Sequence, residues 1–216
     1  MQNKKAILLV GSPKVLGSSS ENLGKLLLRY LSQSGCLTDI ENISVAIRKD
    51  QLNELCDKVN NSDIVIISSP LYVDSLPAPV TYFLEEYTND HKKEKKLIGI
   101  INSGFPEPEQ NNIANDILRL FAEQNGMNWI GGFCIGGGGA LNNSKLETSG
   151  ISKGITQSFK TIANCLSNDL EVSRSIFTDG SKLLMPKSIY IFFAHIGWYS
   201  QAIRNRSLFK LWAKPY

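Results

Sequence analysis

Residues 5–31 read KAILLVGSPKVLGSSSENLGKLLLRYL, and this stretch decides the fold of the chain. Its run 6–10 is continuously apolar, which is typical of a strand buried on both faces. The apolar residues after position 22 recur at helical spacing, so a helix follows a short loop of Gly, Pro, Lys and Ser. The first N–H groups of a helix lack intrahelical partners, and the helix dipole is positive there. This strand–loop–helix unit therefore predicts an anion site.

The side chains of the loop indicate which anion would fit. Ser18 and Glu21 match a capping box, and one interpretation is that this cap is the whole role of Ser18. The other interpretation is a phosphate site made of hydroxyl groups and one cation. Its candidate ligands are Ser12, Lys14, Ser18, Ser19 and Ser20. The Walker spacing and the GxGxxG pattern are both absent. The loop therefore fits a terminal monophosphate such as that of FMN.

Two more strand ends carry similar signals, and together the three motifs resemble one family. The sequence GSPKVLGSSSENL at 11–23 resembles the first loop of the flavodoxin-like NAD(P)H-dependent FMN reductases and their quinone-reductase relatives. The resemblance continues at Ser69-Pro70-Leu71-Tyr72 and at Asn102-Ser103-Gly104-Phe105, each after an apolar strand. It covers about residues 5–165. It implies a flavodoxin-like α/β fold with the strand order 2-1-3-4-5.

The rest of the chain alternates between predicted strands and predicted helices. Apolar runs predict strands at 6–10, 37–47, 63–69, 97–101 and 129–135. Helical spacing predicts helices between them. The second helix would begin with Asp50 as its N-cap. The apolar face of the fourth helix would be Ile113, Ile117, Leu120 and Phe121. Five such units specify a doubly wound, five-stranded parallel sheet. Gly136-Gly137-Gly138-Gly139 after the last strand indicates a close approach or a flexible loop.

The resemblance also implies flavin contacts at the ends of the third and fourth strands. Tyr72 offers an aromatic face for the flavin ring, although it could instead pack on the next helix. The 103–105 loop allows backbone approach to the ring, although it could be an ordinary turn. The cofactor-binding residues expected here are Pro70, Leu71, Tyr72, Val73, Ser103, Gly104 and Phe105.

These sites together predict an oxidoreductase. The resemblance implies that NAD(P)H passes hydride to FMN and that a small acceptor, such as a quinone, flavin, nitro or azo compound, then takes the electrons. No catalytic side chain is expected, and His91 and His195 are interpreted as structural or solvated. One alternative is a flavodoxin-type electron carrier without its own substrate. Another is a family member that has lost the cofactor and serves as a binding module.

Composition restricts the protein class. The 216 residues are 42% hydrophobic and 20% charged, which indicates a folded chain rather than a disordered one. The four cysteines have no CxxC or Cys/His spacing, so no zinc or iron–sulfur site is expected. Thiols without such spacing, and an N-terminus without a signal peptide, favour a cytoplasmic protein. No apolar run reaches the length that spans a bilayer.

The C-terminal segment differs from the rest. Six of the 23 Lys and Arg residues lie in 182–216 with no acidic residue, which leaves 17 basic and 20 acidic residues elsewhere, a net charge of −3. We expect a flavodoxin-like domain at 1–168 and a helical extension at 169–216, with helices from Pro186 to Tyr199 and then to Ala213. The extension would pack on the domain or on a second subunit, which favours a homodimer. Contact with an anionic membrane surface is the alternative, and nucleic-acid binding is not expected because the basic residues are few.

Overall fold

The computed structural model describes residues 3–14, 16–88, 94–141 and 146–213. Its centre is a five-stranded, fully parallel sheet in the order β2-β1-β3-β4-β5. The strands are β1 (Lys5–Val10), β2 (Leu37–Asn42), β3 (Ile64–Pro70), β4 (Lys96–Asn102) and β5 (Asn128–Ile135). The predicted doubly wound fold and its strand order are confirmed.

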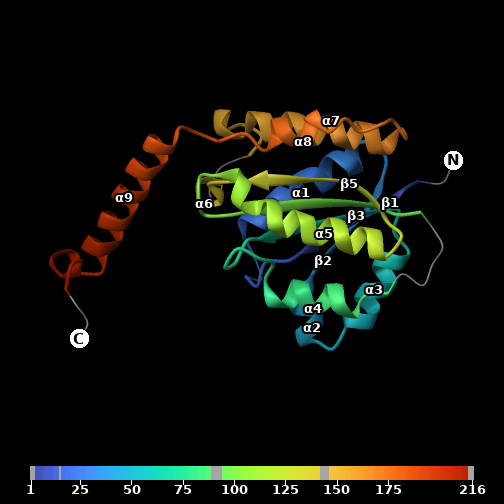
Figure 1. The fold of residues 1–216 in the computed structure, drawn as a ribbon, viewed down its shortest axis with the longest axis horizontal. Coiled ribbons are helices and arrows are strands. Elements are labelled where there is room, and N and C mark those ends of the chain that lie inside the picture. Colours follow the sequence, from blue (N-terminus) through green and yellow to red (C-terminus); the bar gives the residue numbers. More distant parts are fainter. Residues whose placement is uncertain (1–2, 15, 89–93, 142–145, 214–216) are drawn as a thin grey trace.

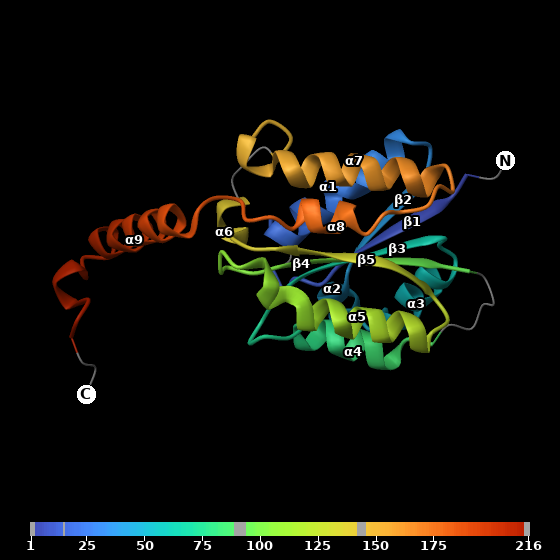
Figure 2. The ribbon, with the colours of Figure 1, turned by 45° about the horizontal axis from the view of Figure 1, so that its top comes forward.

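Helices cover both faces of this sheet (Figure 1). The helices of the described chain are α1 (Ser19–Gln33), α2 (Ile43–Arg48), α3 (Leu52–Asn60), α4 (Ala78–Glu86), α5 (Asn112–Gln124), α6 (Gly138–Leu141), α7 (Lys153–Ser167), α8 (Ser175–Gly180) and α9 (Lys187–Arg204), of which α9 lies away from the sheet. Short 3-10 turns lie at Pro108–Asn111, Gly150–Ser152 and Leu208–Lys210. Figure 2 shows α1, α7 and α8 on one side of the sheet and α2 to α5 on the other.

Two apolar cores follow from this layering. Successive strand side chains point to opposite faces, so β1 contributes Leu8 to the core under α1 and α7, and Leu9 to the core above α2 to α5. Both side chains are completely buried. A strand covered on both faces is apolar along most of its length, which is why β1, β3 and β4 each contain a continuous apolar run. The carboxyl ends of these strands are therefore held rigidly at one edge.

The strand predicted over 37–47 is wrong beyond Asn42. The Asn42 side chain accepts a hydrogen bond from the backbone N–H of Val45 (3.0 Å) and caps α2, and the apolar residues after it lie on a helical turn instead of a strand. The predicted cap at Asp50 is also wrong. Asp50 has a φ of +59°, and the N-cap of α3 is the next residue, Gln51, so the helix begins at Leu52. Short alternating runs fit a strand and an amphipathic turn equally well.

The inner face predicted for α5 is partly wrong. Ile113 and Leu120 are 58% and 48% exposed, and the helix instead presents Asn115 to the sheet. A Cβ added at Gly99 or Gly132 would lie within 2.3 Å of Asn115 Oδ1. The two glycines therefore leave the space that the Asn115 amide fills. A buried amide that depends on two distant glycines gives no periodic signal in the sequence.

The C-terminal arm, which we define as residues 182–213, leaves the layered body. Both views show α9 extending away from it (Figures 1 and 2). The helix begins after Pro186 as predicted, but it continues past Tyr199 to Arg204. The second predicted helix is a single 3-10 turn. Among the described residues, none of the helices has the length and apolar character needed to cross a membrane.

Replacing Asn42 tests the cap that begins α2. Asn42→Ala removes the side-chain acceptor for the Val45 N–H, so we expect the free energy of unfolding to fall by about 1 kcal/mol. Asn42→Ser retains a capping oxygen and should lose less. Urea denaturation followed by circular dichroism measures both. Equal stability of Asn42→Ala and the parent chain would show that this cap does not hold the β2–α2 junction.

Candidate functional site

Three loops meet at the carboxyl edge of the sheet, after β1, β3 and β4. The Ser20 hydroxyl donates to Asn102 Oδ1 (2.6 Å), which joins the first turn of α1 to the end of β4. The Ser68 hydroxyl donates to the Ser20 carbonyl (2.7 Å), and the Leu71 N–H donates to the Asn102 carbonyl (2.8 Å). The three segments that carry the predicted cofactor-binding residues are therefore neighbours in space.

The first loop ends in the predicted cap. The Ser18 hydroxyl accepts from the Glu21 N–H (3.1 Å), and Glu21 Oε2 reaches back to the Gly17 N–H (2.6 Å). Gly17 has a φ of +69°, a conformation that glycine adopts without strain. Burial acts to raise the pKa of Glu21, but its bonds to Lys25 and to the Gly17 backbone outweigh that effect and lower the pKa. The Glu21 carboxylate is thus charged, and its oxygens bond to Lys25 and to the loop backbone.

The loop hydroxyls divide into two classes. Ser19 donates to the Gly138 carbonyl (2.7 Å), and Ser20 donates to Asn102, so both hydroxyl hydrogens are engaged. Ser12 and Ser18 are buried, and their oxygens accept from backbone N–H groups. Neither of these two hydroxyls donates to another described residue. Their hydrogens are thus available to an anion.

Lys14 is the cation of this loop. Its side chain is exposed, and its Nζ donates to the Gly17 carbonyl (3.2 Å). It forms no ion pair with the described residues, so its charge is available near Ser12. Val15, which follows it, lies outside the described residues.

The second loop is a tight turn after β3. Tyr72 and Ser75 exchange two backbone hydrogen bonds (2.8 and 3.0 Å) around Val73 and Asp74. Val73 and Asp74 have φ angles of +48° and +57°, which form a type I′-like turn. A β-branched residue in this conformation is strained, and Val73 is 99% exposed. Tyr72 is 50% exposed, so it does not pack fully on α4. Strain of this kind is concentrated at ligand sites.

The third loop is supported from behind by the glycine run. The Gly138 N–H donates to the Ser103 carbonyl (2.7 Å), and the Gly137 N–H donates to the Phe105 carbonyl (2.6 Å). A Cβ on Gly136 would lie 2.2 Å from the Pro106 carbonyl oxygen. The close approach predicted for these glycines is therefore to the 103–106 backbone. A Cβ on Gly104 would meet nothing within 4 Å, so this side of the loop is open.

Three residues that support the site were not among the predicted ligands. Asn102 joins the first and third loops, as described above. Asn111 is completely buried, and its Nδ2 donates to Ser103 Oγ (3.4 Å) and to the Ile135 carbonyl (3.3 Å). Tyr190, in the first turn of α9, donates to the Gly104 carbonyl (2.6 Å). Asn102 stood inside a recognised motif, but nothing local to Asn111 or Tyr190 in the sequence indicated these contacts.

The histidines do not contribute to this site as far as the described residues show. His195 is an exposed residue of α9, and its ring lies 6.3 Å from that of Trp198, centroid to centroid. His91 lies outside the described residues. The interpretation of His195 as structural or solvated rather than catalytic stays a prediction.

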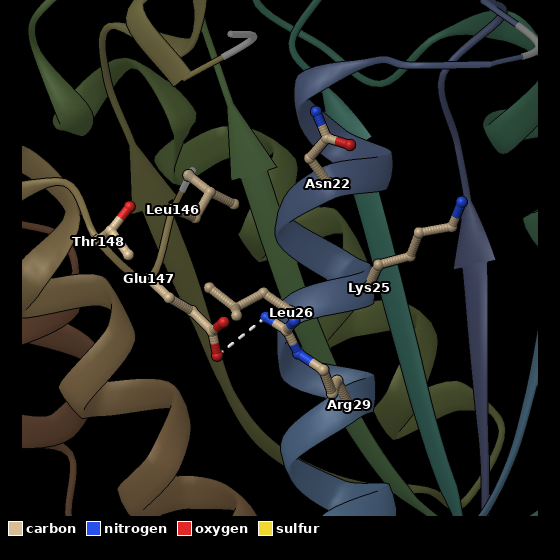
Figure 3. Close-up of a pocket in the computed structure, with 7 residues that line it drawn as sticks. All are labelled: Asn22, Lys25, Leu26, Arg29, Leu146, Glu147 and Thr148. Carbon is tan, nitrogen blue, oxygen red and sulfur yellow. Dashed lines mark ion pairs between the residues drawn. The ribbon is translucent and has the colours of Figure 1, made fainter. Parts of the chain in front are cut away.

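A separate cavity of about 470 Å³ lies on the outer side of α1, against residues 146–148 (Figure 3). Arg29 pairs with Glu147 there at 2.9 Å, and Lys25 pairs with Glu21. The basic side chains are thus neutralised by carboxylates. Among the described residues that line this cavity, both basic side chains are paired, and the cavity is distinct from the three loops.

Comparison with known proteins assigns the chain to a family. The model of the NADPH-dependent FMN reductase family matches residues 5–138. Searching the curated proteins by sequence gave no match.

Solved structures share the fold at low sequence identity. An NADH:FMN oxidoreductase (EMOB, apo form) is 16% identical with a TM-score of 0.60, covering 85% of this chain and 97% of its own. RosB, solved with 8-demethyl-8-formylriboflavin-5′-phosphate, is 11% identical with a TM-score of 0.57, covering 94% and 88%. The NAD(P)H:quinone oxidoreductase of Methanothermobacter marburgensis is 12% identical with a TM-score of 0.54, covering 76% and 98%. With the family match, which spans more than half of the sequence, the chain belongs to the NADPH-dependent FMN reductase family.

Proposed function

We propose that this protein binds FMN across the three loops and passes electrons from NAD(P)H to a small acceptor. The observation that carries the proposal is the pair of buried hydroxyls, Ser12 and Ser18, whose hydrogens have no acceptor among the described residues. They lie beside Lys14, which forms no ion pair with the described part of the chain, and beside the N-terminus of α1, and together these features favour a phosphate monoester.

The chemistry of the loop residues supports a division of roles at the phosphate end. Ser12 and Ser18 would donate hydroxyl hydrogen bonds, and Lys14 would add charge from the exposed side. Ser19 and Ser20 would contribute backbone N–H groups of the first helical turn, because their hydroxyls are committed elsewhere. The five predicted phosphate residues thus remain in the proposal, with two of them acting through the backbone.

The other two loops would hold the ring. Tyr72 and Phe105 are half exposed, at 50% and 57%, and aromatic faces of this kind stack on planar heterocycles. Backbone around Pro70, Leu71 and Val73 would meet the polar edge of the ring. The open side of Gly104, next to Ser103, allows close backbone approach.

The bound flavin would supply the redox chemistry, accepting hydride from a nicotinamide and passing electrons on. The chain's own residues bind and orient the cofactor, and no side chain is required as an acid or base. We propose a quinone, flavin, nitro or azo compound as the acceptor class. The quinone oxidoreductase among the structural neighbours is consistent with this range.

Turnover separates this proposal from a flavodoxin-type carrier. We expect the purified chain loaded with FMN to oxidise NADPH when a soluble quinone is the only other reactant. A carrier would need a separate reductase to be reduced by NADPH. The measurement is the loss of NADPH absorbance, with the FMN-free chain as control. Turnover that appears only after a reductase is added would favour the carrier.

Replacing Ser12 tests the phosphate site. Ser12→Ala removes a hydrogen bond to a charged group, so we expect FMN to bind about 10- to 100-fold more weakly. Ser62→Ala is the matched control, because the Ser62 hydroxyl is also buried but donates to the Lys58 carbonyl. Quenching of flavin fluorescence on titration gives both affinities. An unchanged affinity in Ser12→Ala would remove Ser12 from the site.

We further propose that the chain forms a homodimer through α9. Residues spaced alternately three and four apart along this helix form an exposed apolar stripe, and each is at least 43% exposed. They are Ile189, Phe192, Ile196, Tyr199 and Ile203. This is the a/d spacing of a coiled coil, with isoleucine at the a positions and aromatic residues at the d positions, so the stripe could pack against a second helix. Of the α9 residues, all of which the structure describes, Ala202 alone is buried. A second copy of the helix would cover the stripe.

The surface of α9 weighs against the membrane alternative. An interfacial helix needs a broad polar face, but Ile191 and Trp198 are exposed on the opposite side of α9 from the stripe.

The cysteines bear on the location of the protein. None of the four cysteines forms a disulfide. This state suits a reducing compartment, so we propose a cytoplasmic protein.

Charge placed in the stripe tests the dimer. Ile196→Glu would bring two carboxylates together in an apolar contact, so we expect a monomer by size-exclusion chromatography with light scattering. Gln201→Glu adds the same charge on another side of the helix and should remain dimeric. A dimer of unchanged strength in Ile196→Glu would contradict pairing through α9. Binding of the parent chain to anionic vesicles would favour the membrane surface instead.

A further inference from the structure

A cavity of about 400 Å³ lies between α2, α4 and the loop after β1. Pro13, Ile47 and Pro79 contribute apolar walls, Arg48 and Tyr82 contribute a guanidinium and a phenol ring, and Ser44 lies in the lining with its hydroxyl oxygen buried. Small-molecule sites typically have this volume and this mixture, in which a few polar groups stand in an apolar lining. Of these lining residues only Pro13 belongs to the three loops, and the others lie on α2 and α4.

Ser44 has hydrogen-bonding capacity that the protein does not use. Its residue is 7% exposed, and its Oγ has no hydrogen-bond partner among the described residues. A buried hydroxyl without a partner costs stability unless something else bonds to it. Because this oxygen has no protein hydrogen bond to lose, rotating the Ser44 side chain toward a ligand is inexpensive.

The Arg48 guanidinium is held at one atom, Nε, and its terminal Nη groups can bind a ligand. Its Nε donates to the Ser44 carbonyl (3.2 Å), which ties the side chain to α2. It forms no ion pair with any described residue, whereas Arg29 and Arg119 pair with Glu147 and Glu123. The terminal Nη groups can therefore bind an anion in the bidentate geometry that suits phosphate.

The cavity adjoins the proposed flavin site. Asn42, the cap of α2, donates from Nδ2 to the Ser12 carbonyl (3.2 Å), so α2 is tied to the phosphate loop. Pro13, the next residue of that loop, is part of the cavity wall. On the far side α4 begins at Ala78 without a side-chain cap, and its N-terminus adds a favourable dipole for negative charge. A molecule that reaches the flavin could therefore extend into this cavity.

We propose that the cavity binds the adenosine 2′-phosphate end of NADPH and so selects NADPH over NADH. The adenine ring would lie against Tyr82, which is 44% exposed, and the apolar wall. The 2′-phosphate monoester, which NADH lacks, would pair with Arg48 and accept from Ser44. This inference rests on the proposed function, because it assumes that a nicotinamide dinucleotide is the electron donor.

The direct test uses nucleotides that carry no nicotinamide. Calorimetric titration of the full chain should show that adenosine 2′,5′-bisphosphate binds at least about tenfold more tightly than adenosine 5′-monophosphate. Arg48→Gln should weaken the bisphosphate about tenfold or more and leave the monophosphate unchanged. Arg119→Gln, on the paired surface arginine of α5, should change neither. Ser44→Ala should weaken the bisphosphate less than Arg48→Gln does.

Kinetics give a second readout on the FMN-loaded enzyme. Arg48→Gln should raise the KM for NADPH toward that for NADH, with the KM for NADH unchanged. Equal affinity of the parent chain for both nucleotides, binding of neither at millimolar concentration, or full bisphosphate affinity in Arg48→Gln would overturn the inference. The titration needs no flavin. A failure to bind FMN would therefore contradict the proposed function, but the nucleotide titration could still be interpreted.

Discussion

The hydrogen bond from the Ser20 hydroxyl to Asn102 Oδ1 joins two loops that are 82 residues apart in the chain. Both residues are buried, at 1% and 6% exposure, so breaking the bond would leave two polar groups without water. The same Ser20 accepts from Ser68 through its carbonyl, and Asn102 accepts from Leu71. One buried junction therefore holds the ends of β1, β3 and β4 together, and the site depends on it.

Much of the fold could be predicted because burial on both faces leaves a direct mark on the sequence. The middles of β1, β3 and β4 are continuously apolar, and the loops after them carry Gly, Ser and Pro. Predictions failed where a single side chain outweighed the pattern. Asn42 turned an alternating run into a helical turn, and Asn115 filled the space above two glycines. Such contacts depend on residues that the local sequence does not reveal.

The candidate site was likewise predictable only in part. The sequence pattern predicted that the serines lie in an anion-binding loop, but the hydrogen-bond partners of their hydroxyl groups follow from the tertiary structure. Ser19 donates to Gly138, which is 119 residues away. Tyr190 and Lys187 at the root of α9 contact Gly104 and Glu107, so the C-terminal arm begins on the third loop. An event on the arm, such as pairing with a second copy, would therefore act at the loop proposed to border the flavin.

The central claim is that the loop after β1 binds the phosphate of FMN. The most direct measurement compares the affinities of the full chain for FMN and for riboflavin, which has the same ring but no phosphate. With at least two charge-assisted hydrogen bonds to the phosphate, FMN should bind about 100-fold or more tightly than riboflavin. Equal affinities would contradict the account, because the loop would then contribute nothing beyond capping its helix.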